Sequence, residues 1–278
     1  MSDYLDQHPE IFMSVKELHH FGEDIKFQFP KLDRASYLDY FKRAGNESRI
    51  GEAAVWYLYS ATAAREIKEF CPAADIIIML RNPVDMVYSL HSEFLFTGDE
   101  DIEDFQGALN AEADRRNNRR MPDSCHNPQG LQYRSVGRYA QQVERYLKVF
   151  GRKHVHIILY DDFRDRTAEV YRDTARFLGV SISFVPSLEV KNPNKSVYSK
   201  RFQHFMTNTP DVLRVIARAF LPQAMRMKLR RKLTYLNARY VNRQTLPERE
   251  RQTLITEFTP DIKQLEQLIR RDLSAWLK

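Results

Sequence analysis

Residues 75–97 read DIIIMLRNPVDMVYSLHSEFLFT, and this stretch decides the fold of the chain. The apolar run 76–80 predicts a buried strand that ends at Arg81. Apolar residues then recur at helical spacing, so a helix follows the strand with almost no loop. Asn82 is a suitable N-cap for this helix, and Pro83 suits its first turn.

Arg81 is placed where open parallel sheets bind ligands, at the carboxyl end of a strand and against a helix N-terminus. Its guanidinium is a fixed cation with a planar fork that matches phosphate. Ser89, two turns into the helix, is positioned to add a hydroxyl. The alternative is a surface arginine that pairs with a neighbouring carboxylate, and Arg81 taken alone leaves both readings open.

Strands alternate with helices along most of the chain. We expect helices at 2–7, 34–43, 61–70, 102–116 and 168–178, and strands at 49–54 and 154–160. Ser135 is expected to cap a helix that ends at Gly151, region 98–131 reads as a polar, mobile excursion, and Pro260 is expected to break the last helix. This order predicts a three-layer α/β fold in which helices flank a parallel sheet.

Length and composition fit one domain over residues 1–278. A chain of 278 residues with 43% hydrophobic residues buries one substantial core. No apolar run is long enough to cross a membrane, and the N-terminus lacks the features of a signal peptide. Cys71 and Cys125 are too few for a disulfide framework or a zinc site, so we expect a cytoplasmic protein.

The net charge of +6 is concentrated in the segment 214–243. Nine Lys and Arg residues and no acidic residue lie between Asp211 and Glu248, which favours an anionic partner. Pro222 interrupts the segment, and no nucleic-acid-reading module is recognisable. We therefore favour a solvated, basic-faced helix near an acidic substrate over binding to nucleic acid or a membrane surface.

The order strand, Arg81, Pro83, helix, Ser89 resembles the 3′-phosphate-binding segment of the sulfotransferase family, whose pattern is Arg-x-Pro followed by Ser at the eighth position after the Arg. Stretches 135–163, 170–180, 191–201 and 258–276 are also similar to family segments, the last to the C-terminal helix of carbohydrate-type members. The resemblance implies a P-loop-NTPase-like sulfotransferase fold. It also implies transfer of a sulfuryl group from 3′-phosphoadenosine 5′-phosphosulfate (PAPS), without a metal, to a hydroxyl or amine of a carbohydrate or small metabolite.

Residues 8–21, HPEIFMSVKELHHF, resemble the Lys-Glu-x-His-Phe segment of glycan sulfotransferases. The resemblance implies that Glu17 is the general base that takes the hydroxyl proton, with Lys16 beside it. His19 matches the family histidine, with His20 inserted after it, and either imidazole is a rival base. The alternative is an exposed turn with solvated charges.

Other site residues are also implied by the resemblance. Lys195 and Arg201 lie in the Asn-rich and Lys-rich loop expected to cover the nucleotide, and Tyr133 and Gly137 match positions near it.

Residues 51–60, GEAAVWYLYS, are similar to a segment that lines the acceptor cleft in relatives. Glu52 and Trp56 are therefore expected to bind the acceptor. A structural hydrogen-bonding role for Glu52 is an equal alternative.

One feature of the family is not found in the chain. Family members begin with a strand and a glycine-rich phosphate loop, whereas this chain begins inside the helix expected to follow that loop. We expect either an N-terminally truncated protein or a degenerate relative, which binds PAPS poorly and turns over little. The alternative functions are a non-catalytic binder of a nucleotide or anionic ligand, and a basic binder acting through 214–243.

Overall fold

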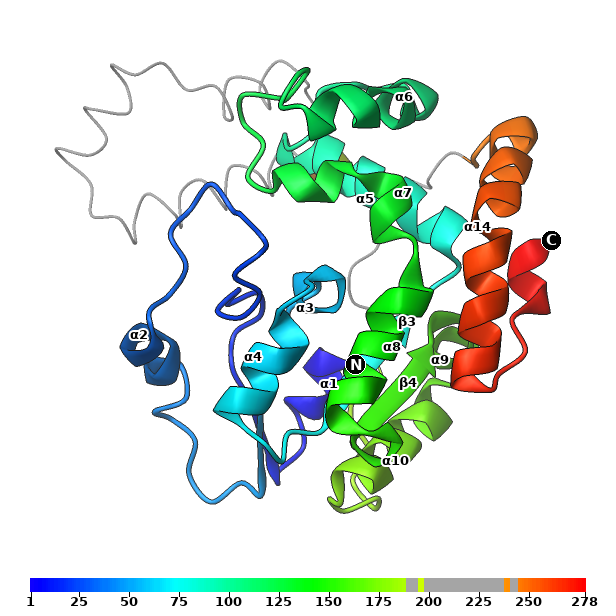
Figure 1. The fold of residues 1–278 in the computed structure, drawn as a ribbon. Helices are drawn as coiled ribbons and strands as arrows, with labels where there is room; N and C mark the ends of the chain where they lie inside the picture. The colour runs from blue at the N-terminus through cyan, green and yellow to red at the C-terminus, as the bar shows by residue number, and fades with distance from the viewer. Residues whose placement is uncertain (189–194, 198–237, 241–244) are drawn as a thin grey trace, which may run out of the picture. The chain divides into compact units, whose positions relative to one another are not determined.

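The computed structural model describes residues 1–188, 195–197, 238–240 and 245–278, and for 195–197 and 238–240 it gives the backbone alone. The chain forms two compact units (Figure 1). Unit 1 comprises Met1–Met86, Arg134–Glu189 and Gln252–Lys278, and unit 2 comprises Val87–Tyr133 and Val190–Arg251. The single-domain assignment stays a prediction. The expectations for Arg201 and for most of 214–243 lie outside the described residues.

Unit 1 contains two pairs of parallel strands. β1 (Ile11–Met13) pairs with β2 (Arg49–Gly51), and β3 (Ile76–Leu80) pairs with β4 (Val155–Leu159). Its helices are α1 (Ser2–Leu5), α2 (Arg34–Asp39), α3 (Trp56–Tyr59), α4 (Ala63–Phe70), α8 (Tyr139–Phe150), α9 (Tyr160–Asp165) and α10 (Thr167–Leu178). The helices α5 (Pro83–Thr97), α7 (Tyr133–Val136) and α14 (Glu248–Ile269) each have residues in both units. Parallel strands joined through helices confirm the predicted α/β class.

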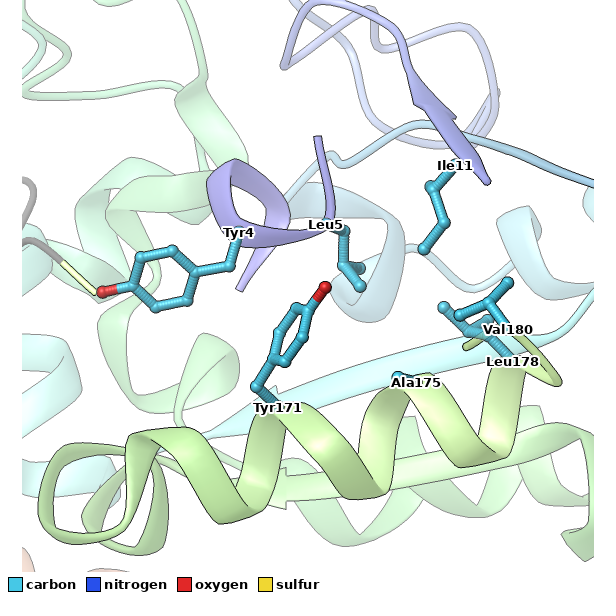
Figure 2. Packing of buried hydrophobic residues seen from close by; sticks show 7 residues of the cluster. All are labelled: Tyr4, Leu5, Ile11, Tyr171, Ala175, Leu178 and Val180. Carbon is cyan, nitrogen blue, oxygen red and sulfur yellow. The ribbon is translucent and has the colours of Figure 1, made fainter. Parts of the chain in front are cut away.

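The core of unit 1 packs α10 against the N-terminal segment. Figure 2 shows Tyr171, Ala175 and Leu178 of α10 facing Leu5 and Ile11. Fully burying one such side chain stabilises the fold by about 1.5–3 kcal/mol. This contact therefore fixes α1 and β1 on α10.

A second buried cluster fixes the segment that carries Glu17. Leu18 and Phe21 pack against Tyr37 of α2 and Ala63 of α4. Leu18 and Phe21 thus turn inward, and Glu17, next to Leu18, is left at the surface.

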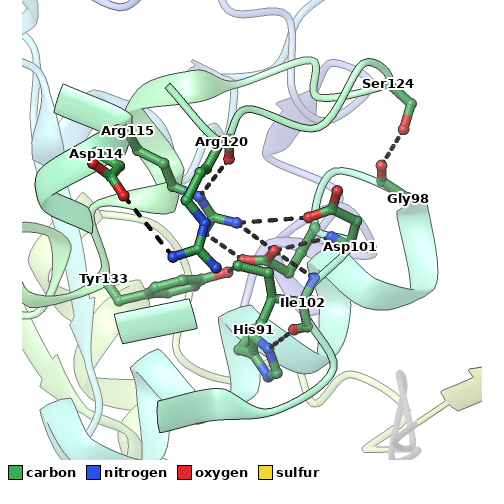
Figure 3. A network of polar contacts seen from close by, with 10 residues as sticks. His91, Gly98, Asp101, Ile102, Asp114, Arg115, Arg120, Ser124 and Tyr133 are labelled. Carbon is green, nitrogen blue, oxygen red and sulfur yellow. Dashed lines mark hydrogen bonds and ion pairs between the residues drawn. The ribbon is translucent and has the colours of Figure 1, made fainter. Parts of the chain in front are cut away.

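Region 98–131 of unit 2 contains α6 (Phe105–Arg116), which confirms the helix expected at 102–116. The region differs from a solvated excursion because some of its charged side chains are buried, namely Asp99, Glu100, Glu112 and Arg115. Figure 3 shows the polar contacts of Arg115. Arg115 donates hydrogen bonds of 2.5 and 2.6 Å to Glu100, and both side chains are fully buried. The hydroxyl of Tyr133 donates to the same carboxylate at 2.8 Å. The region therefore packs around a buried ion pair, which the reading as a mobile excursion did not include.

Three expectations about helix and strand boundaries were wrong. Ser135 lies inside α7, and α8 begins at Tyr139, where the Asp261 carboxylate of α14 accepts the backbone N–H groups of Tyr139 and Ala140. The cap comes from a distant helix, which no local pattern shows. Pro260 lies inside α14 without ending it. Proline removes one backbone hydrogen-bond donor, but the buried apolar residues on both sides of Pro260 hold the helix in the core.

The third difference concerns the stretch for which a loop and helices were expected. Lys195–Val197 and Ala238–Tyr240 form an antiparallel pair, β5 and β6, in unit 2. In the described part of the chain, no helix is long and apolar enough to cross a membrane.

Candidate functional site

Arg81 directly follows β3, and its surroundings follow from the pairing of β3 with β4. Leu80 lies opposite Leu159 in the parallel register, so the next residues of the two strands, Arg81 and Tyr160, also lie side by side. The guanidinium carbon of Arg81 lies 5.1 Å from the centre of the Tyr160 ring. A cation in this arrangement is attracted to the face of the ring.

The alternative reading of Arg81 required a carboxylate partner. Arg81 is half-buried, and within the described ranges it forms no ion pair with any carboxylate. Burial raises the pKa of the Tyr139 hydroxyl, and the positive charge of Arg81 opposes that rise, which places Arg81 near the start of α8. Among the described residues, Arg81 therefore lies against the ring of Tyr160 and near Tyr139, and it forms no ion pair with an acid.

The junction between β3 and α5 is fixed by Asn82, as the sequence predicted. The Asn82 side-chain oxygen accepts the Val84 N–H at 3.0 Å, which caps the helix. The Asn82 amide donates to the Trp276 carbonyl at 3.4 Å, which ties the junction to the C-terminal segment. Asn82 is buried, so the backbone that presents Arg81 is held on both sides.

Glu17 lies in a loop with an unusual backbone. Glu17 and His19 have φ values of +62° and +51°, in the left-handed region that residues other than glycine rarely adopt. The Glu17 carboxylate accepts the Val55 N–H at 3.2 Å, and its side chain is 38% exposed. The neighbouring Lys16 forms an ion pair of 2.5 Å with Asp3.

The pKa values of Glu17 and His19 are shifted from their ordinary values. Burial raises the pKa of the Glu17 carboxyl, which makes it a stronger base. Burial, together with the charge of Lys31, lowers the pKa of His19 to about 4. His19 is therefore neutral at pH 7, and its 3.7 Å separation from Glu17 is neither an ion pair nor a hydrogen bond.

Glu52 turns away from the surface toward two tyrosines. One of its oxygens accepts hydrogen bonds from the hydroxyls of Tyr37 at 2.9 Å and Tyr57 at 3.0 Å. Its other oxygen is buried without a hydrogen-bond partner. Burial raises the pKa of Glu52, and the nearby charge of Glu17 adds to the rise. These contacts favour the structural alternative for Glu52. Trp56, half-buried at the start of α3, lies 6.2 Å from the Tyr59 ring.

The predicted site residues are divided between the two units. Lys16, Glu17, His19, Glu52, Trp56, Arg81 and Gly137 belong to unit 1, and Ser89, Tyr133 and Lys195 belong to unit 2. Within unit 1 the structure brings Glu17, His19 and Glu52 into one neighbourhood. Gly137 is buried between α7 and α8, Ser89 lies on α5, and Lys195 is the first residue of β5. Tyr133 is fully buried, so it presents no surface to a ligand in this structure.

Sequence reasoning missed the tyrosines around these residues. Tyr160 had a usable signal, because it ends the apolar run of β4 just as Arg81 ends that of β3. Tyr37 and Tyr57 gave none, since a tyrosine near a helix is ordinarily read as core.

A partly open pocket of about 90 Å³ lies elsewhere in unit 1, between β4, α9 and α10. None of the predicted site residues lines it, and two of its arginines, Arg166 and Arg271, both pair with Asp162. In the described part of the chain, no group of His, Cys, Asp or Glu side chains is arranged to hold a metal ion.

Comparison with known proteins agrees with this arrangement. Residues 62–237 match the model of the sulfotransferase domain family. The chain is similar to a crystal structure of a sulfotransferase from Alicyclobacillus acidocaldarius, with 30% identity and a TM-score of 0.73 over 100% of this chain and 93% of that one. A search of curated proteins returned no match. The match of fold and sequence over most of its length shows that the chain belongs to the sulfotransferase domain family.

Proposed function

We propose that this sulfotransferase transfers a sulfuryl group from PAPS to a hydroxyl of a carbohydrate or small-molecule acceptor, with Arg81 binding the 3′-phosphate. The observation that carries the proposal is the state of Arg81. It is a half-buried cation at the carboxyl end of β3, held on the Tyr160 ring, with no carboxylate partner among the described residues. The planar fork of such a guanidinium is suited to bind a phosphate through two parallel hydrogen bonds.

The surroundings of Arg81 fit a nucleotide phosphate better than they fit an ion pair within the protein. The Tyr160 ring fixes the plane of the guanidinium, and the Asn82 cap fixes its backbone. The N-terminus of α5 adds a favourable potential for an anion at the same place. PAPS, when bound, supplies the sulfuryl group, and Arg81 would hold and orient its phosphate.

Glu17 is the proposed base. Its carboxylate is accessible to an acceptor hydroxyl, and its raised pKa favours taking the hydroxyl proton. His19 is a weaker candidate, because its lowered pKa makes it a poor proton acceptor at neutral pH. Lys16 would act beside the base only after leaving Asp3, with which it pairs here.

The remaining residues keep proposed roles of lower rank. Ser89, Lys195 and Arg201 are proposed to add contacts to the nucleotide, and Trp56 is proposed to contact the acceptor. Gly137 would lie near the nucleotide through its backbone. The burial of Tyr133 and its hydrogen bond to Glu100 support a structural role for that tyrosine.

The test is binding of adenosine 3′,5′-bisphosphate, the product nucleotide, measured as a rise in melting temperature. We expect the rise in the unaltered protein and in Arg65→Ala, since Arg65 is a surface arginine whose side chain is 71% exposed and pairs with Glu69. We expect Arg81→Ala to abolish it. A nucleotide-induced rise that survives Arg81→Ala would remove Arg81 from the proposal, and no rise in the unaltered protein would remove the nucleotide.

A further inference from the structure

One hydroxyl holds the far side of the loop that carries Glu17. The Tyr57 oxygen accepts the backbone N–H of His20 at 3.0 Å and that of Phe21 at 3.4 Å. The same hydroxyl donates its proton to Glu52 at 3.0 Å. A tyrosine hydroxyl has one proton and two lone pairs, so these three contacts use its full hydrogen-bonding capacity.

Glu52 sets the direction of that hydroxyl. An ionised carboxylate only accepts hydrogen bonds, so beside it the Tyr57 proton must point toward Glu52, which leaves the oxygen lone pairs for the two backbone donors. Tyr37 donates to the same Glu52 oxygen at 2.9 Å and holds the carboxylate from the other side. Burial, with the nearby Glu52 charge, raises the pKa of Tyr57, so the phenol keeps its proton.

Tyr57 is itself fixed by the core. Its backbone carbonyl accepts the Tyr146 hydroxyl of α8 at 2.7 Å. Arg145 of α8 donates to the carbonyl of Ser60, just after α3. The Tyr57 ring packs at 5.6 Å, edge to face, on Phe21. The Tyr57 hydroxyl therefore has a fixed position, and the loop is hydrogen-bonded to it.

The loop needs such a tie because its backbone is strained. Glu17 and His19 both adopt positive φ, a conformation that persists only where the surroundings impose it. The Glu17 N–H donates to the Ala53 carbonyl at 2.9 Å, which fixes the start of the loop, and Tyr57 fixes its far side at His20 and Phe21.

We propose that Tyr57 and Glu52 are positioning residues for the Glu17 carboxylate: Tyr57 holds the loop by its two backbone N–H groups, and Glu52 orients the Tyr57 hydroxyl so that it accepts them. The importance of this for sulfuryl transfer depends on the proposed role of Glu17 as base. The hydrogen-bond network itself does not depend on that role. In this proposal Glu52 supports the base and does not bind the acceptor.

The first measurement is hydrogen exchange of the His20 and Phe21 backbone amides by NMR. In Tyr57→Phe the two amides lose their acceptor, and we expect exchange to speed up by roughly tenfold, the effect of one hydrogen bond. We expect a similar change in Glu52→Gln, because an amide can donate to Tyr57 and reverse its hydroxyl. Tyr40→Phe is the matched control, since Tyr40 is 42% exposed at the end of α2. Exchange in Tyr57→Phe within threefold of the unaltered protein would overturn the proposal.

The second measurement is the titration of Glu17, followed by NMR with ¹³C-labelled glutamate carboxyls and assigned with Glu17→Gln. A loop released from Tyr57 exposes the carboxyl, so we expect the pKa of Glu17 to fall toward its ordinary value in Tyr57→Phe. A merely structural role for Tyr57 would leave this titration unchanged, and an unchanged titration would overturn the proposal. Tyr57→Phe removes only a hydroxyl and should fold, which circular dichroism checks.

The same samples separate this inference from the proposed function. Adenosine 3′,5′-bisphosphate is expected to raise the melting temperature of Tyr57→Phe as much as that of the unaltered protein, because Arg81 is untouched. If no protein shows the rise, the proposed function fails while the exchange result still decides the network.

Discussion

The buried ion pair of unit 2 offers a quantitative test of how this fold uses charge. Arg115 and Glu100 are both fully buried and joined by two short hydrogen bonds. Removing one member of a buried pair costs about 3–5 kcal/mol, because the other charge is left in the interior. The two members should not cost the same here, since their other partners differ.

Glu100 has more partners than Arg115. Besides Arg115, the Glu100 carboxylate accepts the Tyr133 hydroxyl at 2.8 Å and the backbone N–H groups of Asp101 and Ile102 at 2.9 Å. Arg115→Met leaves three donors on Glu100, so we expect a loss of about 3 kcal/mol. Glu100→Leu leaves those three donors and the Arg115 guanidinium without their carboxylate. The remaining contacts of the guanidinium include the Arg120 carbonyl at 3.2 Å. We therefore expect a loss of stability of about 5 kcal/mol. The double variant should be more stable than Glu100→Leu alone, since it removes the stranded cation.

The assay is native-state hydrogen exchange of the α6 amides, which reports the local free energy of opening. Fluorescence is unsuitable, because Trp56 and Trp276, the two tryptophans, both lie in unit 1. A loss below about 1 kcal/mol in Arg115→Met, or Glu100→Leu proving the milder change, would refute the reasoning.

The pair also predicts a pH dependence. Burial by itself would raise the pKa of Glu100, but hydrogen bonds from Arg115, the Ile102 N–H and Tyr133 hold it below the ordinary value of 4.5. Its contribution is therefore complete above pH 4.5 and is lost as the pH falls through the lower pKa of the folded state. The exchange free energy of α6 should follow that course in the unaltered protein and flatten in the double variant.

Three further predictions concern unit 1. Asn82→Ala should lower the free energy of unfolding by about 1 kcal/mol through loss of the α5 cap, measured by urea titration, and Asn82→Asp should lose less because it keeps the acceptor. Gly179→Ala should cost about 1 kcal/mol, because Gly179 has φ +69° and an added Cβ would meet only Arg49 at 3.5 Å, and an unchanged urea midpoint would contradict this conformational cost. Glu17→Gln should reduce sulfation from labelled PAPS by at least about 100-fold and leave nucleotide-induced stabilisation intact, and a variant with full turnover would exclude Glu17 as base.

The sequence was sufficient where a pattern is local. The apolar run before Arg81, the Asn82 cap and the helix that follows were all predicted within a residue or two, because a buried strand, a capping amide and helical spacing are each visible in a few adjacent residues. The same holds for α10, which ends at Gly179 as expected.

The misses share a physical cause, which is partners far apart in sequence. The cap of α8 comes from Asp261, more than a hundred residues away, and the partner that draws Glu100 inward is Arg115 across a loop. From sequence alone a charge-rich stretch is read as solvated, because the position of the opposite charge that pairs with it is not known. The short strand β1 was missed for the same reason, since its pairing with β2 depends on a distant segment.

One helix relates the proposed phosphate-binding arginine to the proposed base. Tyr139, at the start of α8, lies near Arg81, and Tyr146, seven residues later and so on the same helical face, holds the backbone of Tyr57. Seven residues of helix span about 10 Å. Tyr57 in turn holds the Glu17 loop. The length of α8 therefore helps to set the distance between Arg81 and Glu17. A substitution that shifts α8 along its axis should therefore disturb nucleotide binding and the Glu17 titration together, whereas changes in the loop alone should disturb only the second.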